Sequence, residues 1–255
     1  MTLLRDTWLT YTRAISINLR NPFWLIIGLL QPILYLLLFA PLLEGFTAMP
    51  GFGGDNAYNV FVPGLLVLNA MFGSLFVGFA LLQELQEGVI ERIRVTPMSR
   101  LAIMLGRVFR DVTVFVVQGL ILFALAIPFG FEPNFGGAVL ALIILVLIGL
   151  LLAPLSYTIA LAVKKQESFA GFVNMFALPL MLLSGILLPI VEPIAPGWLV
   201  AIAQVNPFYH AVLGVRALFA GDFGDPEILI GGGLMAALAA LMMWFGARSF
   251  GRAVA

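Results

Sequence analysis

The densest group of charged side chains in this sequence lies in one short segment, QEGVIERIRVTPMSR, at residues 86–100. The chain of 255 residues is only 10% charged and 62% hydrophobic, so this cluster needs an explanation. If the segment begins as a short helix, Val89 and Ile93 belong to an apolar stripe among the charges. Thr96-Pro97 then ends that helix, because the residue before a proline avoids the α region. The charged residues are Glu87, Glu91, Arg92, Arg94 and Arg100.

Two roles fit this segment equally well on its pattern alone. A short helix with an apolar stripe and mixed charges can insert into a groove on a soluble partner. A solvated loop with the same charges can also serve only to fix the orientation of the chain in a membrane. In either case Ser99 is well placed to cap the helix that follows.

Residues for catalysis, metal binding or nucleotide binding are scarce elsewhere. A phosphate-binding P-loop needs Gly-Lys-Ser/Thr, whereas the only lysines, Lys164 and Lys165, follow no glycine. The sequence has no cysteine, no H-E-x-x-H and no G-x-S-x-G motif. His210 is the only histidine, and we interpret it as a satisfied interfacial residue rather than a metal ligand or a base. We therefore expect no enzyme activity, no metal and no cofactor on this chain.

The elements that position these residues are predicted to be membrane-spanning helices. About 20 consecutive apolar residues cross a bilayer, and such runs recur along the chain, which predicts an all-α polytopic fold with a single transmembrane domain at 23–250. The formal net charge is zero, so nucleic acid is not an expected partner. The first run is too long for a signal-peptide core and is interpreted as a retained span. The six predicted spans are 23–43, 60–82, 112–130, 138–163, 168–190 and 228–247.

Positive charge predicts the orientation of these spans. With the N-terminus inside and six spans, twelve of the thirteen Lys and Arg residues lie on the cytoplasmic side, which is the side that positive residues favour. Arg216 is the exception. We therefore expect a multi-pass protein of the cell (inner) membrane, with both termini and the 83–111 loop in the cytoplasm.

The first 22 residues are predicted to form a cytoplasmic helix that lies in the membrane interface. Leu4, Trp8, Tyr11, Ile15 and Leu19 fall on one face at helical spacing, and the arginines fall elsewhere. Such an amphipathic pattern is typical of interfacial helices.

A second segment, Trp198–Ala220, is long enough to span but is interrupted. Asn206-Pro207 divides it into two short pieces, which predicts a pair of re-entrant helices on the external side. Here Arg216 is expected to reach the external surface or to pair with Asp222.

Three motifs resemble those of the membrane subunit (permease) of ABC type-2 exporters. They are VFVPGLL (60–66), QEGVIERIRVTPMSRLAIMLGR (86–107) and NPFYHAVLGVRAL (206–218). The nearest likeness is to the daunorubicin-resistance and nodulation lipo-oligosaccharide export permeases, and it covers nearly the whole chain. Family members usually have a Gly-Thr pair where this chain has Gly88-Val89.

The resemblance implies roles for the segments described above. The 86–100 segment would be the coupling helix that docks into an ATP-binding subunit, the N-terminal helix would be the connecting helix, and the re-entrant pair would close the external exit. The implied coupling residues are Glu87, Gly88, Glu91, Arg92, Arg94, Thr96 and Pro97. The implied gate residues are Asn206, Pro207, Tyr209 and Arg216.

The resemblance also implies an assembly: two copies of this permease with two ABC ATP-binding subunits, which would bind ATP and Mg. The cargo would be hydrophobic or amphiphilic, a drug or a lipid-like molecule. Uncharged polar residues in the spans suit such a cargo, although polar residues in membrane helices more often join helices together. These residues are Gln31, Asn69, Ser74, Gln118, Ser156, Tyr157 and Asn174. Alternatives are a glycan or lipo-oligosaccharide exporter, an integral-membrane enzyme and a structural membrane subunit.

Overall fold

The computed structural model describes residues 3–20, 23–47, 52, 56–89, 98–192 and 194–253. These residues are mainly helical and contain no strand, as predicted. The α-helices are α1 (Leu3–Arg20), α2 (Phe23–Leu34), α3 (Ala40–Leu43), α4 (Ala57–Gln86), α6 (Arg100–Ala126), α7 (Phe135–Val163), α8 (Gln166–Leu182), α9 (Gly197–Ala203), α10 (Pro207–Ala220) and α11 (Pro226–Ala253). A π-helical segment, Tyr35–Phe39, joins α2 to α3.

Within the described chain, five helical stretches are long and apolar enough to cross a membrane. They correspond to five of the six predicted spans and identify a multi-pass membrane protein. The bent pair α9–α10 is a further candidate, either as a broken span or as a re-entrant element. The five stretches are Ile26–Phe46, Ala57–Gln86, Arg100–Phe129, Phe135–Val163 and Pro226–Phe250.

The predicted span at 168–190 differs from the structure. Its helix, α8, has 17 residues and ends at Leu182. At about 1.5 Å per residue it is about 25 Å long, at the short limit for a bilayer crossing. The chain turns after Leu182, and Gly185 adopts a positive φ of 68° that a right-handed helix does not contain.

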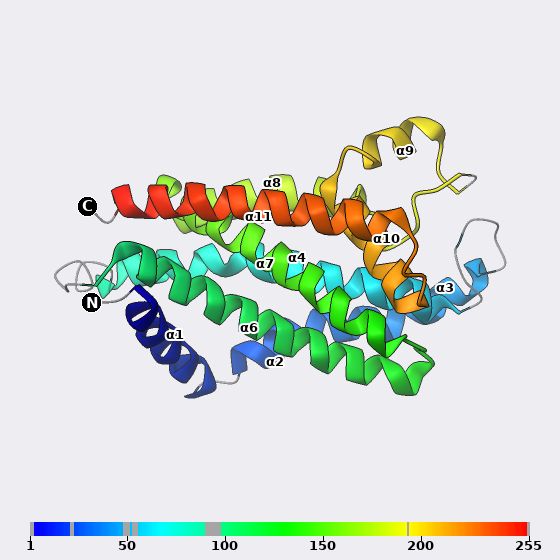
Figure 1. Cartoon of the computed structure of the whole chain (residues 1–255), viewed down its shortest axis with the longest axis horizontal. Coiled ribbons are helices and arrows are strands. Elements are labelled where there is room, and N and C mark those ends of the chain that lie inside the picture. The colour runs from blue at the N-terminus through cyan, green and yellow to red at the C-terminus, as the bar shows by residue number, and fades with distance from the viewer. Residues whose placement is uncertain are drawn as a thin grey trace.

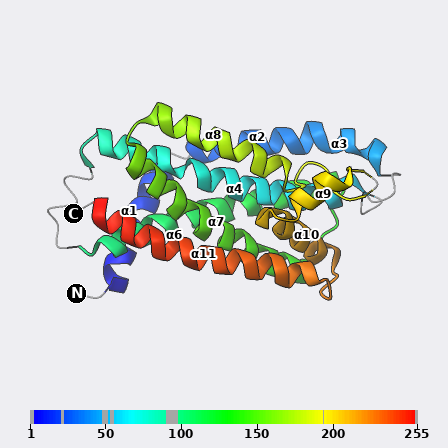
Figure 2. The ribbon, with the colours of Figure 1, turned by 90° about the horizontal axis from the view of Figure 1, so that it is seen from above.

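The bundle is built around α4 and α7, which lie side by side through its middle (Figures 1 and 2). The most apolar stretch of α4 is 72% buried, whereas the corresponding stretch of α11 is only 17% buried. In a membrane the exposed apolar faces contact lipid, so α4 is a core helix and α11 is a peripheral one.

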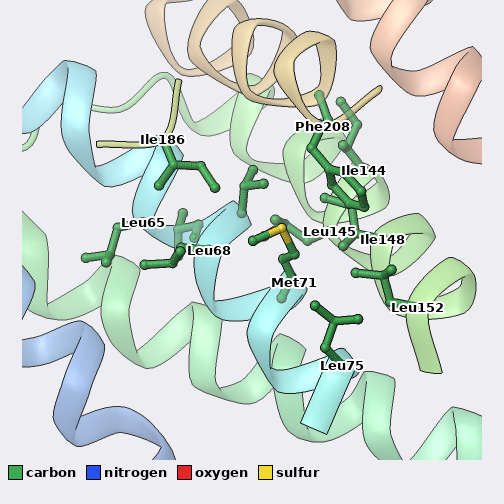
Figure 3. Close-up of a cluster of buried hydrophobic side chains, with 14 of the residues drawn as sticks. Leu65, Leu68, Met71, Leu75, Ile144, Leu145, Ile148, Leu152, Ile186 and Phe208 are labelled. Carbon is green, nitrogen blue, oxygen red and sulfur yellow. The ribbon is translucent and has the colours of Figure 1, made fainter. Parts of the chain in front are cut away.

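The core between α4 and α7 follows from helical spacing. Leu65, Leu68, Met71 and Leu75 of α4 belong to one buried cluster with Ile144, Leu145, Ile148 and Leu152 of α7, and Met71 lies next to Leu145 (Figure 3). Ile186, from the turn after α8, and Phe208, from α10, complete the cluster (Figure 3). Helix α10 of the re-entrant pair is therefore packed into the same core as the spanning helices.

Helix α1 packs obliquely on the start of α6 (Figure 1). The contact is close because Gly106 has no side chain: a Cβ at this position would lie 2.6 Å from the Cβ of Thr10. Leu4, Trp8 and Leu19 of the predicted apolar face point outward, with exposed fractions of 81%, 63% and 75%. This arrangement leaves an apolar face free to enter a membrane interface.

The two ends of the bundle carry different features. Both chain termini, the end of α4 and the start of α6 lie at one end, here called the coupling end (Figure 1). Helices α9 and α10 lie at the opposite end, here called the re-entrant end (Figure 1). The predicted coupling segment and the predicted gate are thus separated by the length of the spans.

Candidate functional sites at the two ends of the bundle

At the coupling end, α4 ends in a turn that redirects the chain. The N–H of Glu87 donates to the carbonyl of Gln83, and the side chain of Gln83 donates to Glu87 Oε1 at 2.8 Å. Gly88 follows with a φ of 69°, a conformation that costs little only for glycine. The positive φ at this turn therefore explains why the motif has a glycine at position 88.

The remaining predicted coupling residues, Glu91, Arg92, Arg94, Thr96 and Pro97, lie outside the described residues. The chain re-enters the described part at residue 98, just before α6. Ser99 caps α6, because its hydroxyl oxygen accepts a hydrogen bond from the N–H of Ala102 at 3.2 Å. This confirms the predicted capping role.

Charged and polar side chains cluster where the end of α4 and the first turns of α6 meet α7. Arg107 of α6 pairs with Glu84 of α4 at 2.5 Å. Arg110 pairs with Asp111 at 2.8 Å, and Tyr157 of α7 donates a short hydrogen bond to the same carboxylate. Here we call these five residues the charge cluster.

The charge cluster joins both flanks of the coupling segment to α7. Glu84 precedes the segment by two residues and Arg107 follows it by seven. Sequence reasoning did not identify the partners of Glu84 and Asp111. The available signal was a negative charge before the segment, Glu84, and positive charges after it, Arg107 and Arg110, but their pairing depends on how α4, α6 and α7 pack.

Polar contacts also join α4 to α7 and α8. Ser156 of α7 donates to the carbonyl of Leu75 at 2.7 Å and accepts from the N–H of Gly78 at 2.9 Å. At the coupling end, Gln166 of α8 donates to Gln86 at 3.3 Å. These contacts support the interpretation of polar residues in the spans, Ser156 among them, as groups that join helices.

At the re-entrant end, the predicted break in Trp198–Ala220 is confirmed. Helices α9 and α10 meet at 91°, and residues 204–206 separate them. Asn206 caps α10 by accepting a hydrogen bond from the N–H of Phe208 at 3.0 Å. Pro207 occupies the first helical position, where its missing N–H costs no hydrogen bond.

Three of the predicted gate residues bind backbone carbonyls of the segment that ends α8. Asn206 donates to Leu180 at 3.1 Å, and the hydroxyl of Tyr209 donates to Ile190 at 3.1 Å. Arg216 donates to Gly185 at 2.8 Å. Helix ends leave carbonyl groups without partners, and α10 supplies donors to this segment.

The predicted pairing of Arg216 with Asp222 is wrong. The carboxylate of Asp222 instead accepts a hydrogen bond from the N–H of Gly224. Besides Gly185, the guanidinium of Arg216 donates to the carbonyl of Val60 at 2.9 Å. It thus connects α10 to the start of α4 as well as to the turn after α8.

Both ring nitrogens of His210 have a hydrogen-bond partner, as predicted. Its Nδ1 lies 2.7 Å from a carboxylate oxygen of Glu227, and its Nε2 lies 2.9 Å from the carbonyl oxygen of Gln204. Sequence reasoning missed Glu227 as a partner, because it lies 17 residues further along the chain. In the part of the chain that the structure describes, no group of three or more His, Cys, Asp or Glu side chains could hold a metal ion.

This chain is similar in sequence to several known proteins that are named as transport permeases. The chain is 27% identical over 237 residues to the daunorubicin resistance ABC transporter permease protein DrrB1 of Streptomyces coeruleorubidus, covering 91% of this chain and 82% of that protein. It is 27% identical over 202 residues to ycf38 of Cyanophora paradoxa, which is named as a transport permease, covering 78% of this chain and 69% of that protein. A protein of Escherichia coli (strain K12) named as a multidrug ABC transporter permease, YbhR, is 28% identical over 151 residues, which cover 58% of this chain and 40% of that protein.

The family model for ABC-2 type transporters matches residues 5–220. This range begins in α1, includes the coupling segment and the charge cluster, and ends with the last residue of α10. The chain therefore belongs to the ABC-2 type transporter family, whose members work with an ATP-binding subunit.

Proposed function

We propose that this chain is the permease subunit of an ATP-driven exporter of hydrophobic or amphiphilic cargo, drug or lipid-like. Two copies of the chain would assemble with two ABC ATP-binding subunits, which bind ATP and Mg and carry out the hydrolysis. The cargo would leave the cytoplasm or the inner leaflet of the cell (inner) membrane. Both chain termini and the 86–100 segment would face the cytoplasm.

The observation that carries this proposal is the position of the two flanks of the 86–100 segment. Both flanks lie at one end of the bundle, and Glu84 before the segment is paired with Arg107 after it. A force applied to this segment would therefore act on α4 and α6 together, and through Tyr157 on α7. That connection suits a segment that couples a soluble ATP-binding subunit to the spans.

The gate would lie at the other end of the same helices. Through Arg216, helix α10 is bonded to the start of α4, and α4 ends at the coupling segment. A movement of α4 along its axis would thus reach the carbonyl contacts that hold α10. The names of the relatives, which refer to daunorubicin resistance and to multidrug transport, support a drug or another apolar molecule as cargo.

Copurification and vesicle transport test the proposal together. A tagged chain extracted in mild detergent is expected to bring down a protein with a P-loop, and inverted vesicles that contain both are expected to accumulate daunorubicin or a fluorescent phospholipid only with ATP. Vesicles that contain the permease alone serve as the control. The proposal would be contradicted if the tagged chain were recovered without an ATP-binding subunit. It would also be contradicted if the vesicles accumulated the test compound to the same extent without ATP.

A further inference from the structure

The only histidine of the chain lies between two hydrogen-bond acceptors at the re-entrant end. Nδ1 of His210 contacts a carboxylate oxygen of Glu227 at 2.7 Å, and Nε2 contacts the carbonyl oxygen of Gln204 at 2.9 Å. A carbonyl oxygen and an ionised carboxylate can only accept. Both contacts are hydrogen bonds only if the ring is protonated on both nitrogens, or if Glu227 carries the additional proton. Either way, the arrangement holds one proton more than a neutral ring beside an ionised carboxylate.

These two contacts connect three helices at a corner of the fold. Gln204 lies at the break where α9 and α10 meet at 91°. His210 is in the first turns of α10, and Glu227 is in the first turn of α11. The N–H of Glu227 is itself bonded to the carboxylate of Asp225 at 2.8 Å, which fixes the start of α11. The imidazole ring therefore holds the α9–α10 corner against α11.

The backbones on both sides of this contact are in close approach. A Cβ at Gly231 of α11 would lie 2.5 Å from the carbonyl oxygen of His210, and a Cβ at Gly214 of α10 would lie 2.8 Å from the carbonyl oxygen of Glu227. Helices α10 and α11 thus form a rigid pair at this point. The α9 side of the contact is different, because α9 has only seven residues and its small hydrophobic cluster includes Tyr209 of α10 but no residue of α11.

The surroundings of His210 leave Glu227 as its electrostatic partner among the described residues. The ring of Tyr209 stands edge-on to the imidazole at 5.6 Å, and α9 contributes only a backbone carbonyl. Helices α4 and α7 also pack against α10, but no charged group of theirs acts on the ring. The side chains of His210 and Glu227 are 15% and 26% exposed, so protons from water can reach them.

We propose that His210 and Glu227 form a proton-dependent latch that holds the α9–α10 corner on α11. With the additional proton, both hydrogen bonds form at once. Without it, the ring can donate to only one of its two acceptors, and the corner is released. The ordinary pKa of histidine is about 6.5, so the latch is closed in acid and opens as the pH rises through the titration of the His210 ring. This inference concerns the chain itself and does not depend on the identity of the cargo or of the ATP-binding subunit.

Spin labels at two exposed positions test the latch directly. Val205 at the corner is 83% exposed and Leu229 on α11 is 81% exposed, and the chain has no native cysteine to compete for the label. The full-length double variant Val205→Cys, Leu229→Cys is reconstituted in nanodiscs, and the label-to-label distance distribution is measured on both sides of the histidine titration range. We expect a narrow distribution in acid and a broader or longer one in alkali. The same distribution at both pH values overturns the proposal.

Two substitutions in the labelled protein separate the latch from other titrations. His210→Leu has no donor for either acceptor, so its distribution is expected to be broad at both pH values. In Glu227→Gln the amide can donate to the neutral Nδ1 while Nε2–H still donates to Gln204, so its distribution is expected to stay narrow at both. If Glu227→Gln still responds to pH as the parent does, the latch is contradicted. Labels at 229 and 241, both exposed on α11, serve as the control, and a pH-dependent change there would assign the effect to α11 itself and overturn the latch.

Discussion

Arg216 and Asp111 show two ways in which the chain accommodates charge inside a membrane bundle. Arg216 is surrounded by backbone carbonyls from the start of α4 and the turn after α8. Asp111 is held by a guanidinium on its own helix and a hydroxyl from α7. Charged groups in membrane helices are costly unless they are paired or bound to backbone carbonyls. Both residues therefore fix the relative positions of helices that are far apart in sequence.

Tyr157→Phe is predicted to destabilise the bundle. It removes a hydroxyl that donates to a buried carboxylate and leaves the shape of the ring unchanged. Loss of a hydrogen bond to a charged group costs about 1.5–3 kcal/mol in soluble proteins, and polar contacts within membrane bundles are often weaker. We expect a loss of about 1–2 kcal/mol, or about 2–6 °C in the thermal unfolding midpoint of the purified chain.

Tyr11→Phe is the matched control for this prediction. The hydroxyl of Tyr11 lies 3.3 Å from that of Thr113, and the contact is only part-buried. Its removal is expected to change the unfolding midpoint by less than about 2 °C. If both variants melt at the same temperature as the parent, the charge cluster contributes nothing measurable to stability.

At the scale of elements, local signals predicted the starts of α6 and α10 and the residues that cap them. Ser99 and Asn206-Pro207 mark helix starts through rules that involve only neighbouring residues, so the sequence was sufficient. The end of α8 at Leu182 was not predicted, because residues 183–190 are apolar enough to continue a span. Their carbonyls are instead bound by α10, from residues more than 15 positions away. The partners of Glu84, His210 and Arg216 were missed for the same reason, since they depend on packing between distant segments.

The re-entrant pair is predicted to leave both of its ends on the external side. The 91° bend between α9 and α10 excludes a single straight spanning helix, as a re-entrant pair requires. Single cysteines at 195 and 224 flank the pair, and both are expected to react with a membrane-impermeant maleimide added to intact cells. A cysteine at position 100, at the coupling end, is the control and is expected to react only after the membrane is opened. Reaction at one flanking position from outside and at the other only from inside would make the pair a spanning element.

At the scale of the whole molecule, the two proposed roles lie at opposite ends of the bundle: coupling to the ATP-binding subunit at one end and the external gate at the other. The coupling end has exposed charges and a capped return into α6, whereas the re-entrant end has helices held by carbonyl contacts. The spans between them contain few charges, which are paired near the coupling end. This division predicts that charge changes at the coupling segment affect association with the ATP-binding subunit and leave the bundle folded.

Glu91→Lys and Arg92→Glu are the variants that test this division. Both positions lie in the predicted coupling helix, where a reversed charge would face the surface of the ATP-binding subunit and weaken docking by about tenfold or more. Glu132→Lys, at an exposed position in the turn before α7, is the matched control. It changes the net charge as Glu91→Lys does, but at the re-entrant end.

The measurements are the amount of each variant in the membrane, the fraction of ATP-binding subunit that copurifies, and ATP-dependent transport. We expect normal membrane levels in all three variants, with binding and transport lost only in the first two. Full binding and transport in both Glu91→Lys and Arg92→Glu would remove the coupling role from this segment, and the positive charges there would then serve only to orient the chain.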